Sequence, residues 1–358
     1  MTQLEKLRSA MSEAAVSALL VTDVINVAWL TGFVGSFARV LVTASDCVFM
    51  TDGRYAIQAE EQVKGASIQI LLPGKDGDQF LIEQINALEI SKLSFEANHL
   101  TYSFVQTLSP KLLPVELVAG PDLFAGLRMI KTPAEIDLIR DACALTDVAF
   151  DHIRRMIMPG ITEFGLELEL EFFIRRHGAT MAFDPIIVSG ENSARPHGRA
   201  TEKPFENGDF LTMDFGARVK HYNADLTRTV VVGKASDEHK RIYHAVLESQ
   251  LAAIAAIKPG GLASDVDKIS RDVLRKHDLV QHFTHGLGHG LGRLVHDSGR
   301  LNSSSTDVFA VGQVWTIEPG VYIPGFGGCR IEDDVVVTEH GVEVLNRAPK
   351  ELLELPLS

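Results

Sequence analysis

The sequence predicts a two-domain α/β protein, with a small α/β domain over residues 1–124 and a larger, internally duplicated α+β domain over residues 125–358. Two observations carry this prediction. Short β-rich runs alternate with helix-like stretches in the first part, and a series of motifs recurs at an offset of 100 residues in the second. The 358 residues and 46% hydrophobic content are sufficient for two cores.

The first domain should begin with an amphipathic helix at the N-terminus rather than a cleaved leader. Its strands are indicated by apolar runs at residues 18–21, 40–42 and 48–50, and a helix is expected near residues 55–64. Pro121-Asp122 marks the expected boundary before a helix that begins at Thr132, where Thr132-Pro133-Ala134-Glu135 forms a capping box with proline at the first helical position.

The second domain contains two copies of one arrangement: helix, Pro-Gly break, helix, then a hairpin. Met158-Pro159-Gly160 recurs as Lys258-Pro259-Gly260, and Arg175-Arg176-His177 recurs as Arg275-Lys276-His277. We expect the second helix of each copy to be capped, at Thr162 and at Ser264. A pseudo-two-fold axis between the copies would bring their hairpins together.

Each hairpin carries two acidic residues. Paired residues of an antiparallel hairpin share one index sum, so we expect Asp214 to face Asp225 across a turn at residues 219–220. The same arithmetic places Glu318 opposite Glu332, around Gly325 in a glycine-rich turn. Like charges held face to face require a compensating cation or proton. The hairpins therefore predict a divalent metal site.

A glycine-histidine stretch should complete this site. His285, His289 and His296 lie within twelve residues, and glycines on both sides of His289 allow the backbone to approach a ligand closely. A fourth histidine, His197, precedes the first hairpin. Imidazoles in such a segment can ligate metal, donate hydrogen bonds or move protons.

These residues resemble the pita-bread metallopeptidases, the family of Xaa-Pro aminopeptidases, Xaa-Pro dipeptidases (prolidases) and methionine aminopeptidases, over essentially the whole chain. The resemblance implies two divalent metal ions held by five ligands: Asp214, Asp225, His289, Glu318 and Glu332. It implies that Asp225 and Glu332 bridge the two ions, and it matches the auxiliary histidines of the family to His197, His285 and His296. Two departures from the family pattern are Arg293 and His221.

The oxygen-rich ligand set favours manganese, with cobalt, iron and zinc as competitors. By the resemblance, a water shared by the two metals attacks the scissile carbonyl and Glu318 accepts its proton. His197 and His296 stabilise the oxyanion and the leaving nitrogen. Arg330, two residues from Glu332 on one strand face, is expected to fix a ligand carboxylate.

The long N-terminal domain, with Asp52-Gly53-Arg54-Tyr55, looks like that of aminopeptidases P. We therefore expect primarily an enzyme that removes the first residue from peptides with proline second. The alternative is an Xaa-Pro dipeptidase, because Arg300 lies where some prolidases place a cation for the substrate carboxylate. A creatinase-like amidinohydrolase and a non-enzymatic binding relative are further alternatives, but such proteins do not keep the full ligand set.

The remaining expectations concern partners and location. A net charge of −13 argues against nucleic acid and anionic membranes as partners. No apolar run approaches the length of a membrane span, and the three scattered cysteines indicate a reducing compartment. We expect a cytoplasmic homodimer that acts on peptide substrates.

Overall fold

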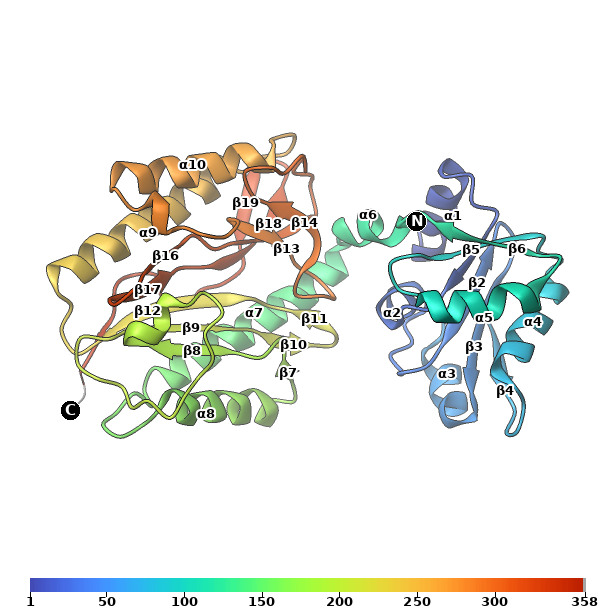
Figure 1. Ribbon diagram of the computed structural model, residues 1–358, viewed down its shortest axis with the longest axis horizontal. Coiled ribbons are helices and arrows are strands. Elements are labelled where there is room, and N and C mark those ends of the chain that lie inside the picture. The colour runs from blue at the N-terminus through green and yellow to red at the C-terminus, as the bar shows by residue number, and fades with distance from the viewer. Residues whose placement is uncertain (357–358) are drawn as a thin grey trace. The chain divides into compact units, whose positions relative to one another are not determined.

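The computed structural model describes residues 1–356 and divides the chain into two compact units, Met1–Arg128 and a second that begins at Met129 (Figure 1). The two-domain α/β architecture predicted from the sequence is confirmed. The break between the units falls four residues after the expected one, inside helix α6 (Leu123–Met129). Each unit has its own sheets and its own cores.

The N-terminal unit is built on a six-stranded mixed sheet with strand order β4-β3-β2-β1-β5-β6. Its strands are β1 (Ala18–Val21), β2 (Arg39–Thr43), β3 (Cys47–Asp52), β4 (Ser67–Leu71), β5 (Lys92–Glu96) and β6 (Glu116–Gly120). Its helices are α1 (Gln3–Glu13), α2 (Val24–Thr31), α3 (Ala56–Gln62), α4 (Gly77–Ala87) and α5 (Tyr102–Leu112).

Both faces of this sheet are covered by helices, which explains why its central strand is a continuous apolar run. Leu19 and Val21 of β1 pack in one hydrophobic cluster with α1, α2 and α3. Ala18 and Leu20 alternate to the opposite face and pack with α4 and α5. The pleat of one buried strand therefore supplies two cores.

The larger unit places its strands between two helix pairs (Figure 1). The pairs are α7 (Pro133–Ile153) with α8 (Glu163–Arg176), and α9 (Asp237–Ala256) with α10 (Ala263–Lys276). The strands of the first half are β7 (Thr180–Met181), β8 (Ile186–Ser189), β9 (Phe210–Phe215), β10 (Ala217–Val219), β11 (Tyr222–Asn223) and β12 (Leu226–Val232). Those of the second are β13 (Gly288–Gly290), β14 (Asp297–Leu301), β15 (Val314–Ile317), β16 (Gly320–Ile323), β17 (Gly327–Arg330), β18 (Asp333–Thr338), β19 (Gly341–Val344) and β20 (Glu354–Leu355).

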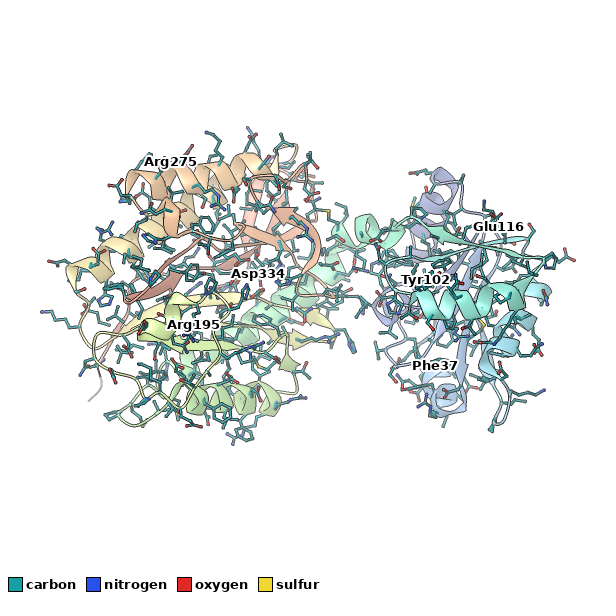
Figure 2. All side chains as sticks on the ribbon, in the orientation of Figure 1. Phe37, Tyr102, Glu116, Arg195, Arg275 and Asp334 are labelled. Carbon is teal, nitrogen blue, oxygen red and sulfur yellow. The ribbon has the colours of Figure 1, made fainter. Side chains whose placement is uncertain are left out.

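The strands form four sheets, with orders β11-β10-β7, β20-β12-β9-β8, β14-β13-β15-β18-β19 and β16-β17. Strand β20 joins the first half by pairing with β12, so Glu354 and Leu355 are built into the sheet of copy one. Polar side chains reach the interior of this unit: Asp334 lies within it, whereas Arg195 and Arg275 lie at its surface (Figure 2).

The two copies share their helix-break-helix arrangement. Gly160 and Gly260 end the two breaks in the left-handed region, with φ of 88° and 82°. The capping box at Thr132 is present, and Thr162 accepts a hydrogen bond from the Gly165 N–H. The predicted cap at Ser264 is wrong, because the cap position of α10 is Leu262, two residues earlier, and it has no side-chain cap.

The backbone takes the place of that missing cap. Leu262, at the cap position of α10, forms a β-bridge with Val308, and the Ala263 N–H donates to the Asp307 carbonyl at 2.9 Å. The helix end is therefore already satisfied without a side-chain oxygen. Asp267, three residues after Ser264, does not serve a cap at that serine and pairs with Arg271 at 2.8 Å.

We expect Gly160→Ala and Gly260→Ala each to lower the free energy of unfolding by about 1 kcal/mol, because an added Cβ has open space around it and the cost is backbone strain alone. Gly126→Ala, inside α6 and equally uncrowded, is the matched control and should be neutral or stabilising. The measurement is the urea transition of the unit that carries each change. Equal effects at all three positions would contradict the strain argument.

Candidate metal centre

The first acidic hairpin is formed by β9 to β12, and its register differs from the predicted one. Asp214 pairs with Thr227, and Arg218 pairs with Asn223, so the turn consists of Lys220 and His221. Both turn residues have positive φ, 46° and 69°, as a tight two-residue hairpin turn requires. A β-branched residue such as Val219 disfavours that conformation, so the centre shifts by one residue. Asp225 therefore lies two positions from the residue opposite Asp214, on the same face.

The second acidic hairpin has the predicted register. Gly320 pairs with Arg330 and Ile323 with Gly327, around Gly325 with φ of 77°. The ladder between β15 and β18 continues with the same index sum. Glu318 and Glu332 thus occupy the gap between two ladder segments that share one register.

The histidine segment approaches the strands of the second half as closely as its glycines allow. A Cβ on Gly288 would lie 2.0 Å from the Thr316 carbonyl oxygen, and one on Gly290 would lie 1.8 Å from that of Ser298. His289 between them is the central residue of β13, and its backbone N–H donates to the Thr316 Oγ1 at 3.1 Å. The flanking glycines are therefore required by packing on both sides of this histidine.

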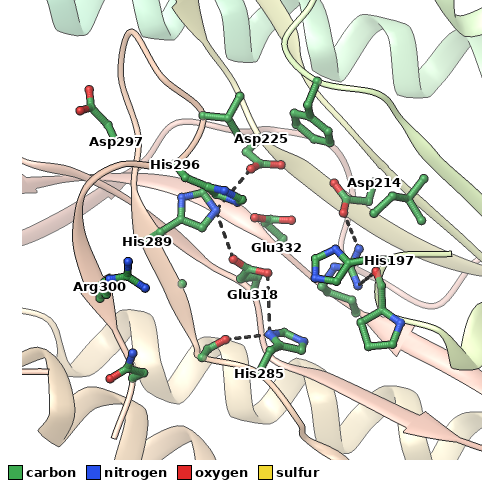
Figure 3. Close-up of a pocket in the computed structure, with 18 of the residues that line it drawn as sticks. His197, Asp214, Asp225, His285, His289, His296, Asp297, Arg300, Glu318 and Glu332 are labelled. Atoms are coloured by element: carbon green, nitrogen blue, oxygen red, sulfur yellow. Dashed lines mark hydrogen bonds and ion pairs between the residues drawn. The ribbon is translucent and has the colours of Figure 1, made fainter. Parts of the chain in front are cut away.

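All ten residues singled out in the sequence line one cavity of about 810 Å³ (Figure 3). The two acidic hairpins contribute five of them: Asp214, Asp225, Glu318, Arg330 and Glu332. The connecting segments contribute the others: His197, His285, His289, His296 and Arg300. The His289 Nε2 lies 3.6 Å from the Asp225 Oδ2 and 3.4 Å from the Glu318 Oε1. Asp225, His289 and Glu332 each offer one ligand atom, and these three atoms lie within 4.8 Å of one another.

Arg330 is buried among these acids and connects both hairpins. Its guanidinium contacts the Asp214 Oδ2. Its Nε donates to the Thr227 Oγ1 at 3.0 Å, and that hydroxyl donates to the Glu332 Oε2 at 2.6 Å. Arg330 therefore orients one acidic residue directly and a second through a threonine, which is how outer groups hold metal ligands in place.

Tyr322 extends this network to His285. The Arg330 Nη1 donates to the Tyr322 hydroxyl at 2.6 Å, so the hydroxyl proton is available for the His285 Nε2 at 2.9 Å. The His285 Nδ1 then carries its own proton, which it donates to the Gly286 carbonyl at 2.8 Å. Burial, then the charge of Arg330, lowers the pKa of His285 to about 3. His285 is thus a neutral, oriented imidazole.

The acids resist ionising together when no cation is present. Burial, then the charges of neighbouring acids, raises the pKa of Asp225 and of Glu332 well above their usual range. Burial likewise raises the pKa of Glu318 to about 8. Burial and the neighbouring His296 lower the pKa of His289 to about 4, so this imidazole is neutral at pH 7 and available as a ligand.

The donor set fits divalent cations. Four carboxylates and one neutral imidazole face the same space, and the buried Asp214 Oδ1 has no hydrogen-bond partner among residues 1–356. Such an orphaned oxygen costs free energy unless something binds it. A hard cation would satisfy that oxygen and relieve the repulsion that raises the carboxyl pKa values.

Behind the acids, Arg228 ties the two halves together through the backbone. Its five N–H donors are all used: they reach the carbonyls of Thr227, Glu332, Ala348 and Pro349 and the Asp333 carboxylate, at 2.6–3.0 Å. Asp334 accepts from the Asp225 N–H at 2.9 Å. Residues adjacent to the acids thus fix their backbones.

Sequence reasoning missed Tyr322, Thr227 and Arg228. The two-residue period of a strand could have indicated Tyr322 and Thr227. Tyr322 is four residues after Glu318 and Thr227 is two residues after Asp225, so each is expected on the same strand face as a ligand. Arg228 gave no such signal. Its partners lie more than 100 residues away in the chain, apart from the adjacent Thr227.

Arg300 lies at the rim of the cavity. It pairs with His289 across β13 and β14, and side chains of paired residues share one face. Its backbone N–H donates to the Asp307 carboxylate, but its exposed guanidinium has no hydrogen bond or ion pair to any residue from 1 to 356. A free cation therefore stands one strand away from the histidine of the metal centre.

Comparison with known proteins gives concordant matches over both units. The model of metallopeptidase family M24 matches residues 137–339, and that of the creatinase/prolidase N-terminal domain matches residues 3–130. An Xaa-Pro dipeptidase of Pyrococcus horikoshii is 35% identical over 98% of both chains. The solved structure of an Xaa-Pro dipeptidase from Bacillus anthracis is 40% identical with a TM-score of 0.95, covering 99% of both chains. An X-Pro aminopeptidase from Thermotoga maritima is 32% identical with a TM-score of 0.90, covering 96% of this chain and 99% of its own.

We expect Asp225→Ala and Glu332→Ala each to abolish tight binding of both metal ions, because each carboxylate faces the shared space and is expected to bridge. Elemental analysis after manganese loading and desalting measures this directly. Asp184→Ala, an exposed acid at the rim of the same cavity, is the control and should keep wild-type metal content. Two retained ions in either ligand variant would refute the ligand assignment.

The metal-free protein should lose stability as pH rises from about 5 to 8. The pKa of Glu318 is about 8 in the folded state, against roughly 4.3 for an unfolded glutamate. A raised folded pKa stabilises the protein fully below the unfolded value, and this stabilisation is lost as pH rises through the folded value. Urea unfolding of chelator-treated protein across this range tests the slope. Manganese should remove it, and an identical slope with saturating manganese would contradict the prediction.

Proposed function

Because this chain belongs to metallopeptidase family M24 and carries a creatinase/prolidase N-terminal domain, we propose that it is a metal-dependent Xaa-Pro dipeptidase. It is a two-domain pita-bread hydrolase that acts on peptides. The dipeptidase assignment is the finer step, and it reverses the order of our expectations, which placed the aminopeptidase first. Relatives named Xaa-Pro dipeptidase favour the alternative.

The observation that carries the proposal is the unpaired guanidinium of Arg300 beside the metal centre. A dipeptide ends in a carboxylate on its proline, a few ångströms from the scissile bond. Arginine suits such a group because its planar fork can donate two parallel hydrogen bonds. A cation held only by its backbone, with no acidic partner of its own, is free to make that contact.

Asp214, Asp225, His289, Glu318 and Glu332 would hold the two metal ions, for which we propose manganese on account of the oxygen-rich ligands. Bound there, the ions would supply a water-derived nucleophile at neutral pH and polarise the substrate carbonyl. Glu318 contacts both sides of the site, at 3.4 Å from His289 and 4.0 Å from His285, and we assign it the acceptance of the water proton.

His197 and His296 would serve the reacting amide. The His296 ring lies edge-on to His289 with centroids 4.3 Å apart, so it is adjacent to the metal centre. Burial, then His197, lowers the pKa of His296, so it is neutral and can donate one N–H to the oxyanion or the leaving nitrogen. Arg330 holds Asp214 and Tyr322 holds His285, and these contacts preorganise the site.

An aminopeptidase that cleaves longer Xaa-Pro peptides is the second candidate. It is supported by the Thermotoga neighbour, named X-Pro aminopeptidase, and by the exposure of Arg300, which leaves the rim open. In this case the chain beyond proline would pass Arg300 without pairing its carboxylate.

The homodimer and the cytoplasmic location stay predictions; within the described residues no helix is long and apolar enough to cross a membrane.

We expect manganese-loaded protein to cleave Xaa-Pro dipeptides with higher kcat/KM than Xaa-Pro-Xaa tripeptides. Arg300→Ala should cost dipeptide cleavage about 2–5 kcal/mol of transition-state stabilisation, as for truncation of one partner of a charge pair. The cost for tripeptides should be under about 1 kcal/mol, because their carboxylate lies one residue further away.

Arg199→Ala provides the matched control. Arg199 also lines the cavity, but unlike Arg300 it already pairs with an acid, Asp184, at 3.5 Å. Its loss should affect dipeptides and tripeptides equally. A preference for tripeptides that survives in Arg300→Ala would establish the aminopeptidase in place of the dipeptidase.

A further inference from the structure

Glu163 is a fully buried carboxylate outside the metal centre that accepts five hydrogen bonds. Its Oε1 accepts from the Ser189 N–H at 2.6 Å and from the Ser189 hydroxyl at 2.9 Å. Its Oε2 accepts from the Asn192 Nδ2 at 3.0 Å, the Thr201 N–H at 3.0 Å and the Thr201 hydroxyl at 2.7 Å. No described cation pairs with this carboxylate.

An arrangement of this kind needs a reason, because removing a carboxylate from water costs several kcal/mol unless its oxygens are fully satisfied. Here the donors satisfy it, and its position in the first turn of α8 adds the favourable field of the helix N-terminus. All five groups donate, and two of them are backbone N–H groups that cannot reverse. If Glu163 were glutamine, its side-chain NH₂ group would therefore face at least one of these two backbone N–H groups, and two donors cannot hydrogen-bond to each other.

These contacts close the base of one loop, residues 192–201. Glu163 Oε2 joins Asn192 at the start of the loop to Thr201 at its end, and the Asn192 amide also donates to the Arg199 carbonyl at 3.1 Å. The N–H of Phe164 donates to the Thr201 carbonyl at 3.0 Å. The loop is thus fastened to the first turn of α8.

His197 lies at the tip of this loop. The tip is a β-turn closed by the Gly198 N–H, which donates to the Arg195 carbonyl at 2.9 Å, with Pro196 and His197 at its centre. The Pro196 carbonyl accepts from Arg330 at 3.4 Å, and His197 lines the cavity (Figure 3). The imidazole itself is exposed, so it is placed by its backbone and not by packing around its ring.

The second copy shows that the fold can form without a carboxylate at this position. The residue equivalent to Glu163 is Ala263, whose N–H donates to the Asp307 carbonyl, and a β-bridge from Leu262 to Val308 fastens the corresponding loop. The first copy has the matching bridge from Thr162 to Pro204. The shared scaffold therefore holds with alanine at this position, and the carboxylate belongs to the copy that carries His197.

We propose that Glu163 is a positioning residue that holds His197 in the active site by closing the loop at residues 192–201. The inference rests on the peptidase function proposed above. It assigns to a buried carboxylate that does not line the cavity control over the orientation of a histidine that does.

The first test needs no substrate. In manganese-loaded Glu163→Gln protein, trypsin should cut after Arg199 at least about tenfold faster than in wild type, because cleavage follows the population of the opened loop. This site is isolated, since Arg195 and Lys203 are followed by proline, which trypsin does not accept. Glu171→Gln, an equal charge change on the exposed face of α8, is the control and should leave the rate unchanged.

The second test is a double-mutant cycle on whichever Xaa-Pro peptide the enzyme cuts. Glu163→Gln should lower kcat on the order of 10- to 100-fold with two metals retained and KM changed little. In a His197→Ala background the same change should cost less than about threefold, because the group that it positions is gone. A purely structural role would instead give the same loss in both backgrounds.

Unchanged cleavage at Arg199 or additive losses in the cycle would each overturn the proposal. So would unchanged turnover in His197→Ala, since no catalytic role would remain to be positioned, although the peptidase assignment would stand. If Glu163→Gln fails to fold, Thr201→Val, which removes one of the five donors, should show the same two effects at smaller size. If the protein does not prefer dipeptides, the trypsin cleavage rate and the double-mutant cycle can still be interpreted.

Discussion

The larger unit is organised around four carboxylates that cannot all be charged at once without a cation. Burial, then repulsion from neighbouring acids, raises the pKa of Asp225 and of Glu332, and the only guanidinium among the described residues that contacts one of the four is Arg330. This constraint accounts for the hairpins, which hold acids on adjacent strands with little freedom. The histidines are neutral for a different reason: burial, with Arg330 beside His285 and His296 beside His289, lowers their pKa, so they do not neutralise the acids in place of a metal.

Two arginines hold these acids in place by different contacts. Arg330 contacts side chains, reaching Asp214 directly and Glu332 through Thr227. Arg228 contacts backbone, and by donating to the carbonyls of Thr227 and Glu332 it fixes the spacing between the two halves of the duplication. Guanidinium suits both tasks because its donors are rigid and several. A lysine at either position would supply charge without that geometry.

The sequence predicted the two domains, the duplication and the members of the cavity, because these depend on periodicity, turn residues and motif spacing. It placed the second hairpin correctly, since glycines mark its turn at Gly325. It misplaced the first by one residue, since the turn at Lys220 and His221 contains no glycine to mark it. The contacts of Glu163, Arg228 and Tyr322 depend on residues brought together by folding, and a single sequence does not reveal them.

Because the charge constraint fixes the hairpins, the loops around them are where substrate choice can vary without loss of the metal centre. The T. maritima aminopeptidase and the B. anthracis dipeptidase both superpose closely on this chain, with TM-scores of 0.90 and 0.95. The duplication provides two such loops at equivalent places, one carrying His197 and the other beginning beside Arg300. The copies share a scaffold but differ in what fastens each loop and in which charge it presents. Specificity can therefore change at one loop while the metal centre and the other loop stay fixed.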